Sequence, residues 1–177
     1  MNRNIAVFLS ARYLPDFERE LIKKAAQILA ECDWTLYYGG GYSGMMGLLS
    51  RTFEGLSDDI VGISTLWLRD SEAVDYNPEK TIFTQSMGSR KELQLANCSK
   101  VLILPGGFGT MDELFEALTL NQLGIINSEI YFYDPELAPV IKGMLKVMIG
   151  RGSISTSDAS RIHFISSDSQ LRGVLYD

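Results

Sequence analysis

The sequence predicts a three-layer α/β fold, with a mostly parallel sheet covered by helices on both faces. Short apolar segments alternate with segments of helical spacing along the 177 residues. Two of the apolar segments, ending at Tyr38 and Leu104, run directly into glycine-rich turns that precede a helix. Strands that alternate with helices in this way pair in parallel, and the helices cover both faces of the sheet. The length suits a single domain, residues 1–177.

Seven short segments rich in apolar and β-branched residues predict the strands. The first contains five consecutive apolar residues, which is the composition of a parallel strand buried on both faces. Two stretches without periodicity, residues 66–79 and 150–157, contain turn-forming residues and predict loops. In chain order, the predicted strands are residues 5–9, 34–38, 59–64, 81–84, 101–104, 129–133 and 162–165.

Six segments between and after these strands predict helices. In the first, Leu21, Ala25 and Ile28 lie on one stripe at helical spacing. Ser89 and Glu92 have the spacing of a capping box, so the third helix is predicted to begin at Ser89. In chain order, the predicted helices are residues 17–30, a helix that begins at residue 45, and residues 89–96, 110–123, 137–149 and 167–175.

The composition excludes several classes of function. A net charge of −6 and a pI near 4.8 argue against a general nucleic-acid binder, which would need a basic face. The apolar run at residues 5–9 is too short for a signal peptide or a membrane span, so we expect a cytoplasmic protein without membrane association. Cys32 and Cys98 lie far apart and His163 is the only histidine, so no metal site is expected.

The segment Pro105–Glu113 predicts a binding site for an anion. It contains three glycines between a predicted strand and the helix that is expected to open near Thr110. Free N–H groups and the positive end of the helix dipole would face a ligand in the turn, and phosphate is the usual anion there. Asp112 and Glu113 would repel a bare phosphate, so the ligand is expected to carry a neutral or cationic reacting centre. The alternative is a tight strand-to-helix connection with ordinary acidic residues.

Two further segments are expected at the same edge of the sheet. The glycine turn 39–44 also follows a predicted strand, and ligands of parallel sheets bind beyond the carboxyl ends of the strands. Arg90 and Lys91 fall in the first turn of the predicted helix 89–96, where the helix dipole disfavours cations. They therefore indicate a nearby negative charge, either a carboxylate or the phosphate of the ligand. The alternative is an exposed, solvated pair of cations.

Helix 110–123 has apolar residues on two sides. Met111, Leu114 and Leu118 form one stripe, whereas Leu120 and Leu123 spread around the other side. A helix that is apolar on two sides buries two sides. We expect one side to pack on the sheet and the other on a second copy of the chain, which would place Glu113 near a subunit boundary. The alternative is a helix that lies deep within one subunit.

The sequence resembles the LOG family, the cytokinin riboside 5′-monophosphate phosphoribohydrolases that are often labelled lysine-decarboxylase-like. Pro105–Glu113 resembles the PGGxGTxxE motif of the family, and Tyr38–Gly47 resembles its second glycine-rich loop. Ser86–Lys91 resembles its SMHxRK segment, and Asn121–Gly124 also fits. The order and lengths of the segments match nearly end to end.

The resemblance implies a Rossmann-like fold, a homodimer or higher homo-oligomer, and hydrolysis of the N-glycosidic bond of nucleoside 5′-monophosphates. It implies no metal or cofactor. The lysine-decarboxylase label is not supported, because no lysine lies in a context typical of pyridoxal phosphate enzymes. Arg90 and Glu113 match the catalytic residues of the family. The residues expected to bind the nucleotide or its phosphate are Gly40, Gly41, Ser43, Gly44, Met87, Lys91, Gly106, Gly107, Phe108, Gly109 and Thr110.

The sequence departs from the family at two places. The Gly-Ser-Ser turn that usually follows the first strand is replaced by Leu9–Tyr13, and the histidine of SMHxRK is Gly88. One phosphate or sugar contact is thus absent or rebuilt, with Ser10 and Arg12 as the candidates. A second hypothesis is therefore a non-catalytic carrier of a nucleotide or of the molybdenum cofactor. A third is a structural relative without a ligand.

Overall fold

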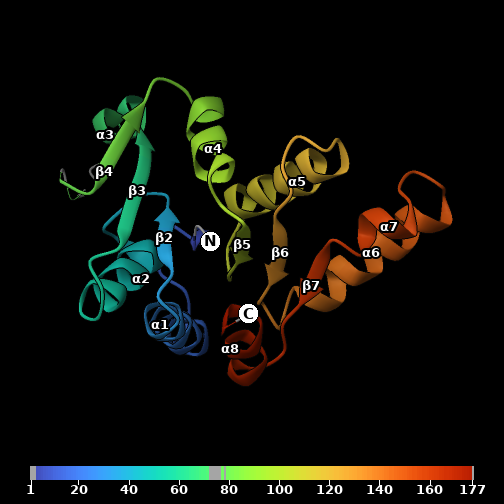
Figure 1. Cartoon of the computed structure of the whole chain (residues 1–177), viewed down its shortest axis with the longest axis horizontal. Coiled ribbons are helices and arrows are strands. Elements are labelled where there is room, and N and C mark those ends of the chain that lie inside the picture. The colour runs from blue at the N-terminus through green and yellow to red at the C-terminus, as the bar shows by residue number, and fades with distance from the viewer. Residues whose placement is uncertain (1–2, 72–76, 78, 177) are drawn as a thin grey trace.

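The strands form one parallel sheet, as the sequence predicts. The computed structural model describes residues 3–71, 77 and 79–176. The strand order is β4-β3-β2-β1-β5-β6-β7, and every neighbouring pair is parallel (Figure 1). The strands are β1 (Asn4–Phe8), β2 (Thr35–Tyr38), β3 (Ile60–Thr65), β4 (Thr81–Thr84), β5 (Lys100–Ile103), β6 (Glu129–Phe132) and β7 (Ile162–Phe164).

Helices follow the strands along the chain. The longest, α1, begins with two acidic residues, Asp16 and Glu18, which suit the positive end of the helix dipole. The helices are α1 (Asp16–Glu31), α2 (Gly44–Glu54), α3 (Leu66–Ser71), α4 (Met87–Ala96), α5 (Phe108–Gln122), α6 (Ala138–Gly150), α7 (Thr156–Ala159) and α8 (Asp168–Tyr176).

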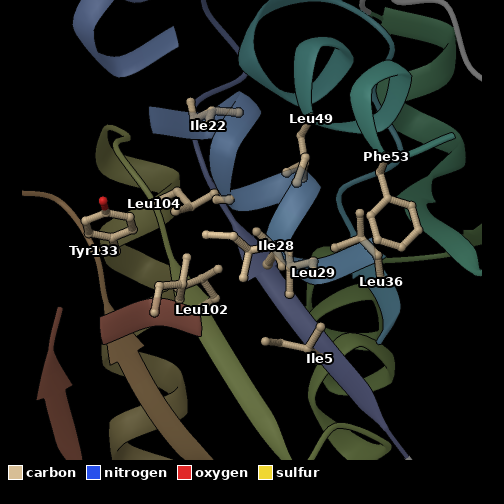
Figure 2. Packing of buried hydrophobic residues seen from close by; sticks show 14 of the residues in the cluster. Ile5, Ile22, Ile28, Leu29, Leu36, Leu49, Phe53, Leu102, Leu104 and Tyr133 are labelled. Carbon is tan, nitrogen blue, oxygen red and sulfur yellow. The ribbon is translucent and has the colours of Figure 1, made fainter. Parts of the chain in front are cut away.

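Two apolar clusters, one on each face of the sheet, give the three layers. On one face, side chains of β1, β2 and β5 pack against α1, α2 and α8, and Figure 2 shows Ile5, Leu36 and Leu102 in this cluster. On the other face, alternate residues of the same strands pack against α4, α5 and α6. Because a strand between two helix layers is apolar on both sides, its sequence reads as a continuous apolar run. All five residues of β1 are buried.

The predicted start of α4 is wrong by two residues. The helix begins at Met87, and its N-cap is Ser86. The Ser86 hydroxyl oxygen accepts the N–H of Ser89, while the Ser89 hydroxyl oxygen accepts the N–H of Ser86. This reciprocal cap replaces the one predicted between Ser89 and Glu92.

The predicted start of α5 is also wrong by two residues. The helix begins at Phe108 with Gly107 as its N-cap, so Thr110 lies within the first turn and does not cap the helix. Asp112 and Glu113 consequently lie in the second turn. The first turn contains no acidic residue, which removes the repulsion that the sequence predicted for a phosphate at this end.

Two short helices occupy parts of the predicted loops. The six-residue helix α3 follows β3 directly, and Thr65 accepts the N–H of Leu68 there at 3.1 Å. The four-residue helix α7 begins after Ser155, whose hydroxyl oxygen accepts the N–H of Asp158. Such short elements have too few apolar positions to show a period. Of the predicted loop 66–79, residues 72–76 and 78 lie outside the described residues.

Candidate functional site

The glycine turn before α5 leaves the amino end of this helix open. Side chains added at Gly107 and Gly109 would meet no atom within 4 Å, and Phe108 between them is 97% exposed. The first N–H groups of a helix have no partner within the helix, so they face outward here with the positive end of the dipole. The geometry is therefore compatible with an anion, and the anion site remains a prediction from the sequence.

Gly106 and Thr110 close the inner side of this turn. A Cβ atom at Gly106 would lie 2.1 Å from Oγ1 of Thr110, far inside contact distance. Thr110 is buried, so its side chain fills the space that the glycine leaves. Gly106 is thus required by close packing within the turn, whereas Gly107 and Gly109 border open space.

Arg90 and Glu113 meet between helices α4 and α5. The Arg90 Nη1 and Glu113 Oε1 atoms lie 3.6 Å apart, and the side chains are only 6% and 8% exposed. The two catalytic candidates from the sequence are thus brought together in a buried ion pair. Glu113 lies four residues after Gly109, on the same face of α5 as the open turn.

Arg90 lies close to three further residues: Ile63 of β3, Met87 of its own helix, and Gly39 directly after β2. Its Nε donates a hydrogen bond to the backbone carbonyl of Ile63, near the end of β3, at 2.9 Å. The Met87 sulfur lies 3.9 Å from Nη1, so Met87, a predicted ligand contact, touches the guanidinium. On the other side, Nη2 lies so close to Gly39 that a Cβ there would be 2.5 Å away.

Burial changes the acidity of Glu113. Removal of the carboxylate from water raises the pKa of Glu113 from an ordinary value of 4.5 to about 7. The charge of Arg90 acts in the opposite direction and is smaller in effect, while Asp112 adds to the rise. A carboxyl group with a pKa near neutrality is suited to accept a proton from water.

Lys91 bridges α4 to α5. Its ammonium nitrogen lies 3.0 Å from a carboxylate oxygen of Asp112 and pairs also with Glu116. The negative charge that the sequence predicts beside Arg90 and Lys91 is therefore a set of carboxylates on α5. Because the Arg90 N–H is bonded to the Ser86 carbonyl, both cations lie beyond the first turn of α4.

The second glycine turn is covered by the protein itself. A Cβ at Gly44 would lie 2.0 Å from the carbonyl oxygen of Ala11, and the N–H of Met45 donates to the carbonyl of Arg12. The altered first loop thus covers the amino end of α2. Of the ligand contacts predicted in this turn, Gly40, Gly41 and Gly44 are buried and Ser43 is exposed.

Two contacts of the site were missed by sequence reasoning. The Ile63 carbonyl is a backbone group in a strand, and no sequence pattern marks it. Gly39 is the first of three consecutive glycines at the end of β2. The glycine run was a signal for a close approach, but the sequence does not show which side chain approaches.

The outer side of α5 is partly exposed. Leu114 and Ala117 are buried against the sheet, whereas Leu123 and the following Ile125 are exposed. A groove of about 810 Å³ runs between α4 and α5, with Leu95 and Leu120 among its lining residues. The helix is therefore not enclosed by its own subunit on that side, and a second copy remains an expectation.

The described part of the chain shows neither a membrane span nor a metal cluster. Within residues 3–71, 77 and 79–176, every helix is too short or too polar to cross a bilayer. Across the same residues, no three His, Cys, Asp or Glu side chains are grouped so that they could hold a metal ion.

Comparisons with known proteins identify the family. Residues 46–173 match the family model described as "Possible lysine decarboxylase". The chain is 34% identical over 119 residues to cytokinin riboside 5′-monophosphate phosphoribohydrolase of Mycobacterium tuberculosis, a match that covers 66% of this chain and 64% of the relative. The protein of the same name from Mycobacterium marinum is 30% identical over 131 residues, covering 74% and 70%.

A solved structure shares the fold at low identity. The molybdenum cofactor binding protein from Rippkaea orientalis superposes with a TM-score of 0.71 at 18% identity, over 99% of this chain and 96% of that protein. This likeness confirms the three-layer fold. The family model covers well over half of the chain, so the protein belongs to the LOG family, as its motifs indicate.

Proposed function

We propose that this protein hydrolyses the N-glycosidic bond of a nucleoside 5′-monophosphate, of the AMP or cytokinin riboside monophosphate type, to the free base and ribose 5-phosphate. The observation that carries the proposal is the buried Arg90–Glu113 pair beside the open amino end of α5. The names of the Mycobacterium relatives support it. The match spans only 64% of the Mycobacterium tuberculosis relative. The proposed activity therefore rests on the geometry of the site as well as on the names of the relatives.

The spacing along α5 fits a ribose 5-phosphate. The proposed phosphate site is the turn Gly106–Thr110, with the N–H groups of its open side as donors. Glu113 lies about 6 Å further along the helix axis than Gly109, at 1.5 Å per residue. The 5′-phosphate and the C1′ atom of one ribose are separated by a comparable span, so a phosphate held at the turn would place C1′ near Glu113.

The reaction follows from these positions. As the C1′–N bond breaks, positive charge develops on the sugar, and the Glu113 carboxylate stabilises it. The oxygen of a water molecule bonds to C1′, and Glu113 accepts the proton that this water loses. Arg90 donates a hydrogen bond to the departing base, which takes up a proton from solvent as it leaves, and Glu113 afterwards releases its proton to solvent. The sum is the addition of one water across the broken bond.

The remaining predicted contacts belong to the same proposal. Met87 touches Arg90 and is exposed enough to meet the ligand. Lys91 would reach a phosphate only by leaving Asp112 or Glu116. The covered glycine turn before α2 would contact the ligand through exposed Ser43. The functional unit is a homodimer or higher homo-oligomer in the cytoplasm, where the free thiols of Cys32 and Cys98 would stay reduced.

The experiment is an assay of base release. The protein is incubated with AMP and with N6-substituted AMP, and the free base is separated and quantified. We expect base release from at least one of them. In Glu113→Gln, base release should collapse while ribose 5-phosphate still binds.

The alternative function is a non-catalytic carrier of a nucleotide or a related cofactor. The covered amino end of α2, where the first loop departs from the family, favours it. Tight binding of nucleoside monophosphates without turnover of any of them would establish the carrier and refute the hydrolase.

A further inference from the structure

Gly39 lies against the guanidinium group of Arg90. It directly follows β2 at the carboxyl edge of the sheet and is buried. A Cβ atom at Gly39 would lie 2.5 Å from Arg90 Nη2 and 2.9 Å from Met46 Sδ. Real Cβ atoms are not found that close to another heavy atom, so a side chain at position 39 would displace one or both groups.

The glycine is required for space and not for backbone conformation. Gly40, the next residue, has a φ of +80°, which disfavours any other amino acid. Gly39 has no positive φ, so an alanine could adopt its backbone conformation. The three atoms that an added Cβ would meet, Arg90 Nη2 and the Met46 Sδ and Cε atoms, belong to the ends of side chains. The fold can therefore tolerate the change, and the Arg90 guanidinium would move.

We propose that Gly39 is a positioning residue for Arg90: its missing side chain lets the guanidinium lie between the end of β2 and the Glu113 carboxylate. Three contacts then fix the group. Nε is held by the Ile63 carbonyl, Nη1 faces Glu113, and Nη2 occupies the space that a side chain at position 39 would need. The consequence for catalysis rests on the proposed hydrolysis, whereas the placement of Arg90 does not.

The ionisation of Glu113 reports this placement directly. The charges around this carboxyl group are Arg90 and Lys91 from α4 and Asp112 and Glu116 from α5. Arg90 lowers the pKa of Glu113, so a guanidinium pushed away by a new side chain would let that pKa rise. A role of Gly39 in folding alone would leave the pKa unchanged in the folded protein.

The test is an NMR titration of the Glu113 carboxyl carbon in protein labelled with ¹³C-glutamate, with the signal assigned by its loss in Glu113→Gln. Gly39→Ala should raise the midpoint by about 0.5 to 1 pH unit, a part of the shift that a neighbouring charge causes. Gly143→Ala is the control, because a Cβ at that position in α6 meets no atom within 4 Å. It should leave the midpoint unchanged.

A double variant separates the direct effect from an indirect one. Arg90→Ala should itself raise the midpoint, and adding Gly39→Ala to it should produce no further rise, because the group that Gly39 positions is gone. An unchanged midpoint in folded Gly39→Ala would overturn the proposal, and so would an equal further rise in the double variant. Neither result depends on whether the protein hydrolyses a nucleotide.

Kinetics then test the catalytic consequence. In Gly39→Ala, kcat for base release should fall at least about tenfold, while the Kd for ribose 5-phosphate stays within about twofold, because the proposed phosphate turn, Gly106–Thr110, is a separate segment. A raised midpoint without base release from the unaltered protein would refute the proposed hydrolysis alone. A weaker Kd with unchanged kcat would refute the positioning role.

Discussion

The Nη1 atom of Arg90 lies 3.6 Å from the Oε1 atom of Glu113, in a pair of side chains that are almost fully buried. The two residues come from different helices, and neither charge faces bulk water. Such a pair contributes little to the free energy of unfolding, because desolvation offsets most of the attraction between the charges. Its position beside an open helix end supports the catalytic role that we propose for it.

The pH dependence of base release should report Glu113. Burial raises the pKa of Glu113 to about 7, and only the deprotonated carboxylate can accept a proton from water. We therefore expect kcat/KM to rise between pH 5 and pH 8, with an apparent midpoint near 7, and the rise to be absent from the residual activity of Glu113→Gln. A profile that is flat across this interval would contradict the role of Glu113 as the base.

The stability of the protein should depend on the same ionisation. The folded state holds the Glu113 proton more tightly than the unfolded state, where the pKa is near 4.5. This contribution to the free energy of unfolding is fully present below about pH 4.5 and is lost as the pH rises through about 7. Its size is about 3 kcal/mol, from 1.36 kcal/mol per pKa unit.

Urea unfolding at pH 5 and pH 8 would measure this effect. The free energy of unfolding should fall more over this interval in the unaltered protein than in Glu113→Gln, which lacks the titrating group. Equal losses in the two proteins would mean that Glu113 has an ordinary pKa.

Two glycines of the phosphate turn should respond in opposite ways. In Gly106→Ala the new Cβ collides with buried Thr110, so we expect a loss of stability of about 1 to 3 kcal/mol. In Gly109→Ala the Cβ enters open space on a helix, so stability should stay equal or rise slightly. Affinity for ribose 5-phosphate should nevertheless fall, because the methyl group occupies the space next to the N–H donors.

Thermal unfolding together with calorimetric titration of ribose 5-phosphate would check this contrast. If Gly109→Ala bound the sugar phosphate as well as the unaltered protein, the ligand would not approach this side of the turn, and the proposed phosphate site would be wrong.

Lys91 should stabilise the packing of α4 on α5. Replacing it by methionine removes two ion pairs that are partly exposed, so we expect a loss of about 1 kcal/mol and a Tm lower by about 2 to 4 °C. Lys146→Met on α6 is the control, since that exposed lysine forms no ion pair in the described part of the chain. An unchanged Tm with tenfold weaker ribose 5-phosphate binding would assign Lys91 to the ligand instead, as its sequence motif suggests.

Much of the fold could be predicted because the strands are buried on both faces. A run such as Ile5–Leu9 has no alternative to a central strand, and its position was right to within one residue at each end. The starts of α4 and α5 were harder to predict from the sequence. Ser86 and Ser89 can both cap a helix, and which of them does so depends on how the chain leaves β4. The start of α5 was also hard to predict, because its N-cap, Gly107, has no side chain that could mark it as a cap.

The site was predictable in its residues but not in its contacts. Motifs identified Arg90 and Glu113, yet their proximity depends on how α4 packs against α5, which no local pattern encodes. The sequence predicted ligand contacts in both glycine turns. Only the structure shows that the carbonyls of Ala11 and Arg12 cover the second one. The approach of Arg90 to Gly39 is likewise a tertiary contact.

The strand order has a consequence for how the protein responds to heat. Arg90 lies on the helix that follows β4, an edge strand, which among the described residues pairs only with β3. The proposed phosphate turn, Gly106–Thr110, follows β5, which is paired on both sides. Edge strands detach at lower free energy than central ones. A molecule frayed at β4 would keep the proposed phosphate turn while Arg90 is displaced. If the proposed hydrolysis is correct, warming should therefore abolish base release at a lower temperature than ribose 5-phosphate binding.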